Sequence, residues 1–173
     1  MQQIRLYILM EHEDDPRKCT AARLTKFEEA RSVRDRSRIP GGSIVLDPEA
    51  EKSISREDRD AVMKLGLLAV DCSWNQLSKF PFVRAGLRHR ALPFVLAANP
   101  TNFGKAQKLT TAEALAAAIY ILGFPEQAER VMSRFKWGPV FIEVNREILD
   151  AYASVETSAE VCAIQNDIVG RAP

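Results

Sequence analysis

Short apolar runs alternate with longer polar and amphipathic segments along the chain. Apolar runs of this length, bounded by turn-forming residues, are typical of buried strands. The pattern predicts strands over residues 4–10, 43–46 and 67–70, and the apolar run that reaches Ala97 is a further candidate strand. Because a helical segment lies between the second and third strands, these two are expected to pair in parallel.

Helix signals separate and follow these runs. Ser55 and Asp58 form a capping-box pattern before an amphipathic segment that Gly66 ends. Thr110 and Glu113 repeat the pattern before an alanine-rich segment. Helices are also expected from about residue 20 and over 125–135, 137–154 and 156–171. The chain is therefore predicted to be an α/β protein, with a parallel sheet flanked by helices and a helical C-terminal third.

Polar residues gather where the candidate strands end. Asp47-Pro48 follows the second strand, the sequence DCSWN over 71–75 follows the third, and ANPTNFG over 98–104 follows the fourth run. Ligands of open α/β sheets bind beyond the carboxyl ends of the strands. The helix beginning at Thr110 would offer free N–H groups and threonine hydroxyls to an anion. These features predict a ligand with an anionic end at that helix and an apolar or aromatic part near Trp74.

Each of these residues also has a purely structural interpretation. Trp74 could be a core residue, Asp71 could cap a turn, and Thr110 and Thr111 could be ordinary helix caps. Cys72 fits a buried, inert thiol. The chain carries no G-x-G-x-x-G, P-loop, G-x-S-x-G or H-E-x-x-H motif. His89 fits a surface residue better than a catalyst.

Composition narrows the function without deciding it. The net charge is +1, but residues 17–38 hold eight Lys or Arg against three acids, whereas residues 141–173 hold six acids against two Arg. The basic end could meet phosphate, or it could be a solvated charged surface.

The N-terminus turns acidic too soon for a secretory signal, and no apolar run has the length of a membrane span, so we expect a cytoplasmic protein without a membrane partner. Three dispersed cysteines and two histidines favour neither a zinc site nor a disulfide framework, and no metal is expected. These features alone indicate an α/β ligand binder that could contact RNA.

Several motifs in a fixed order go further. DDPRKCTAARL, IVLDP, VDCSWN, AANPTNFG, KLTTAEALAAAIYILG and FKWGPVFIEVN follow one another along the chain. Together they resemble the archaeal and eukaryotic aminocarboxypropyltransferases of small-subunit ribosomal RNA, over about residues 5–152. The long acidic C-terminal extension of the eukaryotic members is missing, so the chain resembles the archaeal ones. Phe103 stands where that family has a tyrosine, which removes a hydroxyl whose role the sequence does not assign.

The resemblance implies a SPOUT-like α/β fold with a deep trefoil knot, a rare exception to the rule against threaded chains. It implies residues 1–40 as an N-terminal segment with the first strand and a basic loop and helix, and residues 41–173 as the knotted cofactor-binding core with the C-terminal helices, or both as one continuous domain. S-adenosylmethionine (SAM) would donate its 3-amino-3-carboxypropyl group to N3 of a pseudouridine, typically N1-methylated, in small-subunit rRNA. The by-product would be 5'-methylthioadenosine.

Site residues follow from the same resemblance. Trp74 would bury the cofactor's methyl group, the Thr20 backbone with Thr111 or Thr110 would hold its carboxylate, and the backbone at Val70 and Asp71 would meet its ribose. The adenine would lie near Leu92 to Leu96 and near Leu109. Our own hypothesis makes Asp71 the general base that accepts the uridine proton. RNA would approach over a basic surface formed by Arg17, Lys18, Arg23, Lys26, Arg84, Arg88 and Arg90.

Two other functions stay open at this stage. One is a SPOUT methyltransferase that uses the same cofactor, and the other is a ribosome-assembly module that binds RNA without catalysis. The family resemblance implies a monomer, and the sequence shows no clear self-association stripe. The sequence does not give the rRNA position, the need for prior N1 methylation or any partner assembly factors.

Overall fold

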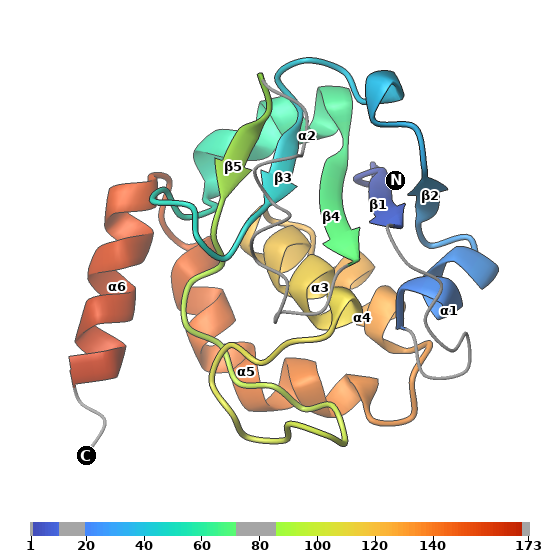
Figure 1. Cartoon of the computed structure of the whole chain (residues 1–173). Helices are drawn as coiled ribbons and strands as arrows, with labels where there is room; N and C mark the ends of the chain where they lie inside the picture. The colour runs from blue at the N-terminus through green and yellow to red at the C-terminus, as the bar shows by residue number, and fades with distance from the viewer. Residues whose placement is uncertain (1, 11–19, 72–85, 171–173) are drawn as a thin grey trace.

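Five parallel strands form one sheet in the computed structural model, which describes residues 2–10, 20–71 and 86–170 (Figure 1). The strand order is β2-β1-β4-β3-β5, and every neighbouring pair is parallel. The strands are β1 (Leu6–Met10), β2 (Arg31–Val33), β3 (Ile44–Leu46), β4 (Leu67–Asp71) and β5 (Arg88–Arg90).

The central strands are buried on both faces, as is usual for parallel sheets. Ile8, Ile44 and Ala69 belong to the main core on one face. Val45 and Leu68, which alternate with them along the chain, belong to a smaller apolar cluster on the other face. The near-continuous apolar sequence of the central strands follows from this two-sided burial.

Besides the strands, the described residues form six α-helices and two short 3-10 helices. The helix α3 is buried along almost its whole length and packs against α1, α4, α5 and β4, so it forms the centre of the main core (Figure 1). The helices are α1 (Thr20–Lys26), α2 (Arg59–Leu65), α3 (Thr111–Ile121), α4 (Pro125–Met132), α5 (Gly138–Ala153) and α6 (Ser158–Gly170), with η1 (Arg36–Arg38) and η2 (Arg56–Asp58).

Most sequence predictions of elements are confirmed. Strands occur within 4–10, 43–46 and over 67–71, and β3 and β4 pair in parallel across α2. The capping box of Thr110 and Glu113 is complete, and in that of Ser55 and Asp58 the Ser55 N–H donates to the Asp58 carboxylate while the Ser55 hydroxyl makes no hydrogen bond within the described residues. Gly66 ends α2 with a φ of +89°. Three helices fill the last third of the chain. The α/β fold with a parallel sheet is therefore correct.

The prediction of a strand ending at Ala97 is wrong. This segment forms only isolated bridges, at Ala91 and Leu96, and Pro93 has no N–H to offer. The N–H of Phe94 donates to Gln165, and the N–H of Leu96 donates to Asn145. The fifth strand is instead the short polar β5, which precedes the apolar run.

The division of the chain near residue 40 stays a prediction. In the structure β1 lies between β2 and β4, so the two proposed parts share one sheet. Across the described residues, every helix falls short of the length and apolar character that a membrane span requires.

Candidate active site

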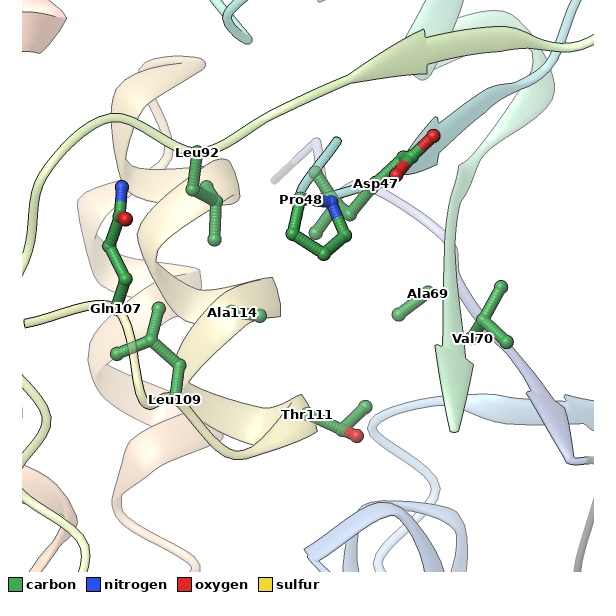
Figure 2. A pocket seen from close by; sticks show the side chains of 10 residues that line it. Asp47, Pro48, Ala69, Val70, Leu92, Gln107, Leu109, Thr111 and Ala114 are labelled. Atoms are coloured by element: carbon green, nitrogen blue, oxygen red, sulfur yellow. The ribbon is translucent and has the colours of Figure 1, made fainter. Parts of the chain in front are cut away.

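A pocket of about 200 Å³ lies at the carboxyl ends of β3 and β4, facing the first turn of α3 (Figure 2). Four segments of the chain form its walls: the ends of β3 and β4, the loop over 92–109, and the first turn of α3. The lining is mainly apolar, with a few polar groups at the rim. It consists of Leu46, Asp47, Pro48, Ala69, Val70, Leu92, Gln107, Leu109, Thr111 and Ala114.

Asp47 fixes the turn at the end of β3. Its N–H donates to the carbonyl of Arg90 across 2.8 Å, and its Oδ1 accepts a bond from the N–H of Glu49. Its Oδ2 lies 2.9 Å from Nδ1 of His89. These bonds hold Pro48, the next residue, against the pocket.

The first turn of α3 is capped from two sides. Thr110 accepts a bond from the N–H of Glu113 and donates its own N–H to the Glu113 carboxylate, the reciprocal pattern of a capping box. The Oγ1 of Thr20 accepts a bond from the N–H of Ala112 at 3.2 Å. The expectation of free N–H groups at this helix start is therefore wrong for two of them. The same bond brings Thr20 next to Thr111.

The loop over 92–109 is tied to α3 through a buried carboxylate. Glu113 accepts bonds from the N–H of Ala98 and from Nδ2 of Asn99, each across 2.7 Å. Farther along the loop, Gln107 adopts a φ of +56° and donates its N–H to the carbonyl of Val95. These contacts position the loop wall of the pocket.

The structure brings several predicted cofactor residues together. Val70, Leu92, Leu109 and Thr111 all line the pocket, and Thr110 and Thr20 cap the helix start at its edge. Asp71 is the last residue of β4. Leu96 is not in the lining, and its N–H and carbonyl bond to the side chain of Asn145. Trp74 lies outside the described residues, and the individual roles stay predictions.

Sequence reasoning did not select six lining residues. For three of them a signal existed, since Leu46, Asp47 and Pro48 form one of the strand ends with turn residues. Ala69 and Ala114 carry no polar atoms in their side chains and give no chemical signal. Gln107 lies in a loop whose path depends on the distant Glu113.

The predicted basic surface is only partly described. Arg17, Lys18 and Arg84 lie outside the described residues. Arg23 and Lys26 are exposed on α1, and Arg88 is exposed on β5. The guanidinium of Arg23 lies over the rings of Phe27 and Phe135, which limits how it can turn.

Arg90 has a different environment. Its Nε donates to both carboxylate oxygens of Asp58 at 3.1 Å, and only 11% of its side chain is exposed. Burial raises the pKa of Asp58, while the neighbouring Arg90 acts in the opposite direction. This buried ion pair explains the presence of Arg90 without any RNA contact.

The sequence is similar to known proteins of one family. Residues 44–169 match the family described as "Ribosome biogenesis protein, C-terminal". A 16S rRNA aminocarboxypropyltransferase of Methanopyrus kandleri is 50% identical over 165 residues, covering 95% of this chain and 98% of that protein. The protein of the same name from Methanosarcina acetivorans is 48% identical over 168 residues, covering 96% and 95%.

A solved structure shares the fold. The structure of the SAM-dependent rRNA:acp-transferase Tsr3 from Vulcanisaeta distributa aligns with a TM-score of 0.87 and 38% identity. The alignment covers 96% of this chain and 89% of that one. The chain belongs to the 16S rRNA aminocarboxypropyltransferase family.

Proposed function

We propose that this protein transfers the 3-amino-3-carboxypropyl group of SAM to N3 of a pseudouridine, typically N1-methylated, in small-subunit rRNA. The observation that carries the proposal is the apolar pocket at the ends of β3 and β4, in a chain whose relatives are named 16S rRNA aminocarboxypropyltransferase. The solved relative is described as SAM-dependent. The reaction belongs to ribosome biogenesis, in line with the matching family description.

The lining of the pocket fits the cofactor. Leu46, Pro48, Leu92 and Leu109 offer apolar walls to a flat adenine ring. Thr111 stands at the rim with its hydroxyl, near Thr20 on the neighbouring helix. Since the N–H groups of residues 112 and 113 already have partners, we propose that the carboxylate binds the Thr111 hydroxyl and the Thr20 backbone.

The identity of the transferred group depends on orientation. SAM supplies a sulfonium whose three attached carbons are all electrophilic, and the carbon that faces the nucleophile reacts. By family resemblance, Trp74 would cover the methyl carbon and leave the aminocarboxypropyl carbon exposed. The new bond joins that carbon to N3, the carbon–sulfur bond breaks, and its electron pair leaves on neutral methylthioadenosine.

The N3 proton needs an acceptor, and we propose Asp71. As the last residue of β4, it follows Val70, which lines the pocket. Asp71→Asn should lower kcat by about 10²-fold or more while the Kd for SAM stays close to wild type. Near-normal turnover of this variant would demote Asp71 to an orienting or capping residue.

RNA would approach over α1, where Arg23 and Lys26 are exposed, together with Arg88 and the basic residues outside the described ranges. Phosphate contacts of this kind release counterions, so rRNA binding should weaken steeply as salt rises. An rRNA affinity that hardly changed with salt would contradict this surface. We leave Arg90 out of it because of its ion pair with Asp58.

Finer features belong to the same proposal. We propose a SPOUT-like trefoil knot, supported by the all-parallel sheet and the likeness to the solved relative. We also propose a cytoplasmic monomer that acts on rRNA or on the small subunit during its assembly, which fits the family description.

The proposed reaction can be tested with two labelled cofactors. Small-subunit rRNA that is unmodified at N3 is incubated with the protein and with SAM labelled either in the carboxyl group or in the methyl group. Carboxyl label in RNA, with methyl label in methylthioadenosine, is the expected result. Methyl label in RNA would instead indicate a methyltransferase. SAM binding without transfer to any form of the rRNA would favour a non-catalytic assembly module.

A further inference from the structure

A second pocket of about 220 Å³ lies at the other end of the sheet from the pocket in which we propose that SAM binds, called the SAM pocket below. Its walls include Arg5, Ser43 and Gly66, the residues immediately before β1, β3 and β4. The SAM pocket uses the opposite ends of β3 and β4. Figure 1 shows the connection from β2 to β3 passing over the strand ends that lie opposite the arrowheads of β3 and β4. The two pockets therefore occupy opposite ends of the same strands.

The floor of the second pocket is aromatic and aliphatic. Parallel pairing sets Tyr7 beside Leu68, and Leu68 beside Val45, so the three side chains project from the same face. Tyr7 packs, partly buried, on the small cluster that includes Ile39 and Leu68. Its ring lies over Gly66, where a Cβ would come within 2.5 Å of the ring carbon Cε2. A flat apolar group therefore has a fixed surface on which to lie.

Cations surround this floor. Arg5, Arg38 and Lys64 line the pocket and are exposed. The Nη2 of Arg5, just before β1, donates to the backbone carbonyl of Lys64 on α2, so these two residues lie side by side. Arg31 at the start of β2 is also exposed and pairs with Tyr7 in the sheet. We call these four residues the basic rim.

Acids offset the basic rim only in part. Asp35 lies 3.7 Å from Nε of Arg38, but both side chains are largely exposed, so their attraction is weak. Asp35 also accepts bonds from the N–H and hydroxyl of Ser37, which lower its pKa and keep it charged. Asp60 stands one helical turn before Lys64. The four cations of the basic rim outnumber these two acids, so the net charge around the pocket is positive.

We propose that the second pocket binds a nucleotide of the rRNA substrate. The base would lie on Tyr7 and the apolar floor, because nucleobases stack on aromatic side chains. The flanking phosphates would meet Arg38, Lys64 and Arg5, since lysine and arginine supply most phosphate contacts. The inference rests on the proposed function, which supplies the RNA. The contact anchors rRNA at the opposite ends of the strands from the transferred group.

Charge reversal tests the rim. The double variant Arg38→Glu/Lys64→Glu should raise the KM for rRNA at least about tenfold and lower the salt slope of rRNA binding by about 2. Its Kd for SAM should match wild type, because both residues are remote from the SAM pocket. Arg146→Glu is the matched control, as it reverses an exposed cation on α5, which packs on α3 and α4. A double variant that binds rRNA as tightly as this control would overturn the proposal.

Cross-linking tests the floor. A small-subunit rRNA fragment substituted with 4-thiouridine is irradiated with the wild-type protein, and the attached peptides are identified by mass spectrometry. Cross-links within residues 5–7, 31–43 or 64–68 are expected. If wild-type protein modifies this rRNA but cross-links only elsewhere, the second pocket is not an RNA site and the proposed function stands. If wild-type protein neither binds nor modifies rRNA, both proposals fail.

Discussion

Asn99 donates a hydrogen bond from its Nδ2 to Oε1 of Glu113 across 2.7 Å, although 14 residues separate them. The other carboxylate oxygen accepts the N–H of Ala98, and Oε1 also accepts the N–H of Thr110. Glu113 is completely buried. A single carboxylate thus both caps α3 and anchors the loop that carries Gln107 to the pocket at the ends of β3 and β4.

Glu113→Gln should therefore weaken both the fold and the cofactor site. One carboxylate oxygen becomes an NH2 group that faces a backbone donor, so the free energy of unfolding should fall by about 2–3 kcal/mol. The Kd for SAM should rise as the loop wall loosens. Urea unfolding and calorimetric titration measure the two effects. Glu143→Gln, an exposed change on α5, should alter neither, and equal behaviour of the two variants would show that the anchor is unimportant.

Thr111→Val tests the proposed carboxylate contact directly. The substitution keeps the shape of the side chain and removes its hydroxyl at the rim of the pocket. Loss of a bond to a charged group should raise the Kd for SAM by about 10- to 100-fold. Methylthioadenosine, which lacks the carboxylate, should bind wild type and variant alike. Thr101→Val, on the exposed part of the loop, serves as the control.

The pair of Asp58 and Arg90 should matter for stability. Asp58→Ala leaves a guanidinium that is only 11% exposed without its carboxylate, so unfolding should cost about 3–5 kcal/mol less. The double variant Asp58→Ala/Arg90→Met should lose less free energy of unfolding than Asp58→Ala alone, because it leaves no unpaired charge buried. Arg146→Ala, which breaks an exposed pair, should cost less than about 1 kcal/mol. If Asp58→Ala and Arg146→Ala lower the free energy of unfolding by the same amount, burial of the Asp58–Arg90 pair has no energetic role.

Local signals explain which parts of the fold could be predicted. Gly66, Thr110 and Glu113 act within one turn of their own helices, so their effect is visible in a short sequence window. The central strands can be recognised in the sequence because burial on both faces requires long apolar runs. The strand ends also located the pocket, since polar turn residues follow β3 and β4.

Long-range contacts explain what could not be predicted. The apolar run over 91–97 has the pattern of a strand, yet its N–H groups at Phe94 and Leu96 donate to the side chains of Gln165 and Asn145. Neither partner can be recognised from the run itself. β2 and β5 are three-residue strands with mostly polar side chains and lack the usual pattern. The ion pair of Arg90 could not be predicted either, because its partner Asp58 lies 32 residues earlier.

Two tyrosines should make stability fall at alkaline pH. Burial, reinforced for Tyr120 by its bond to Asp150, raises the pKa of Tyr120 to about 12, and burial likewise raises the pKa of Tyr152 to about 12. The unfolded chain ionises near 10. The folded state thus holds more protons between these values, so stability is full below about pH 10 and is lost as pH rises toward 12.

Chemical unfolding at pH 9, 10, 11 and 12 measures this loss, with tyrosinate absorbance to follow ionisation. Tyr152→Phe should flatten part of the pH dependence, although it also removes the bond from the Tyr152 hydroxyl to the carbonyl of Phe94. Replacement of the partly buried Tyr7 by Phe provides the comparison. Stability that stays constant between pH 10 and 12 would contradict the raised pKa values.

Gly138 should tolerate no side chain. It is the first residue of α5, and a Cβ at this position would lie 1.7 Å from the carbonyl oxygen of Met132, a backbone atom that cannot turn away. Gly138→Ala must therefore separate α4 from α5, which should cost more than about 4 kcal/mol. Gly41→Ala has open space around it and should change stability by less than about 1 kcal/mol. Thermal unfolding compares the two, and a Gly138→Ala protein as stable as the control would mean that the two helices can move apart at little cost.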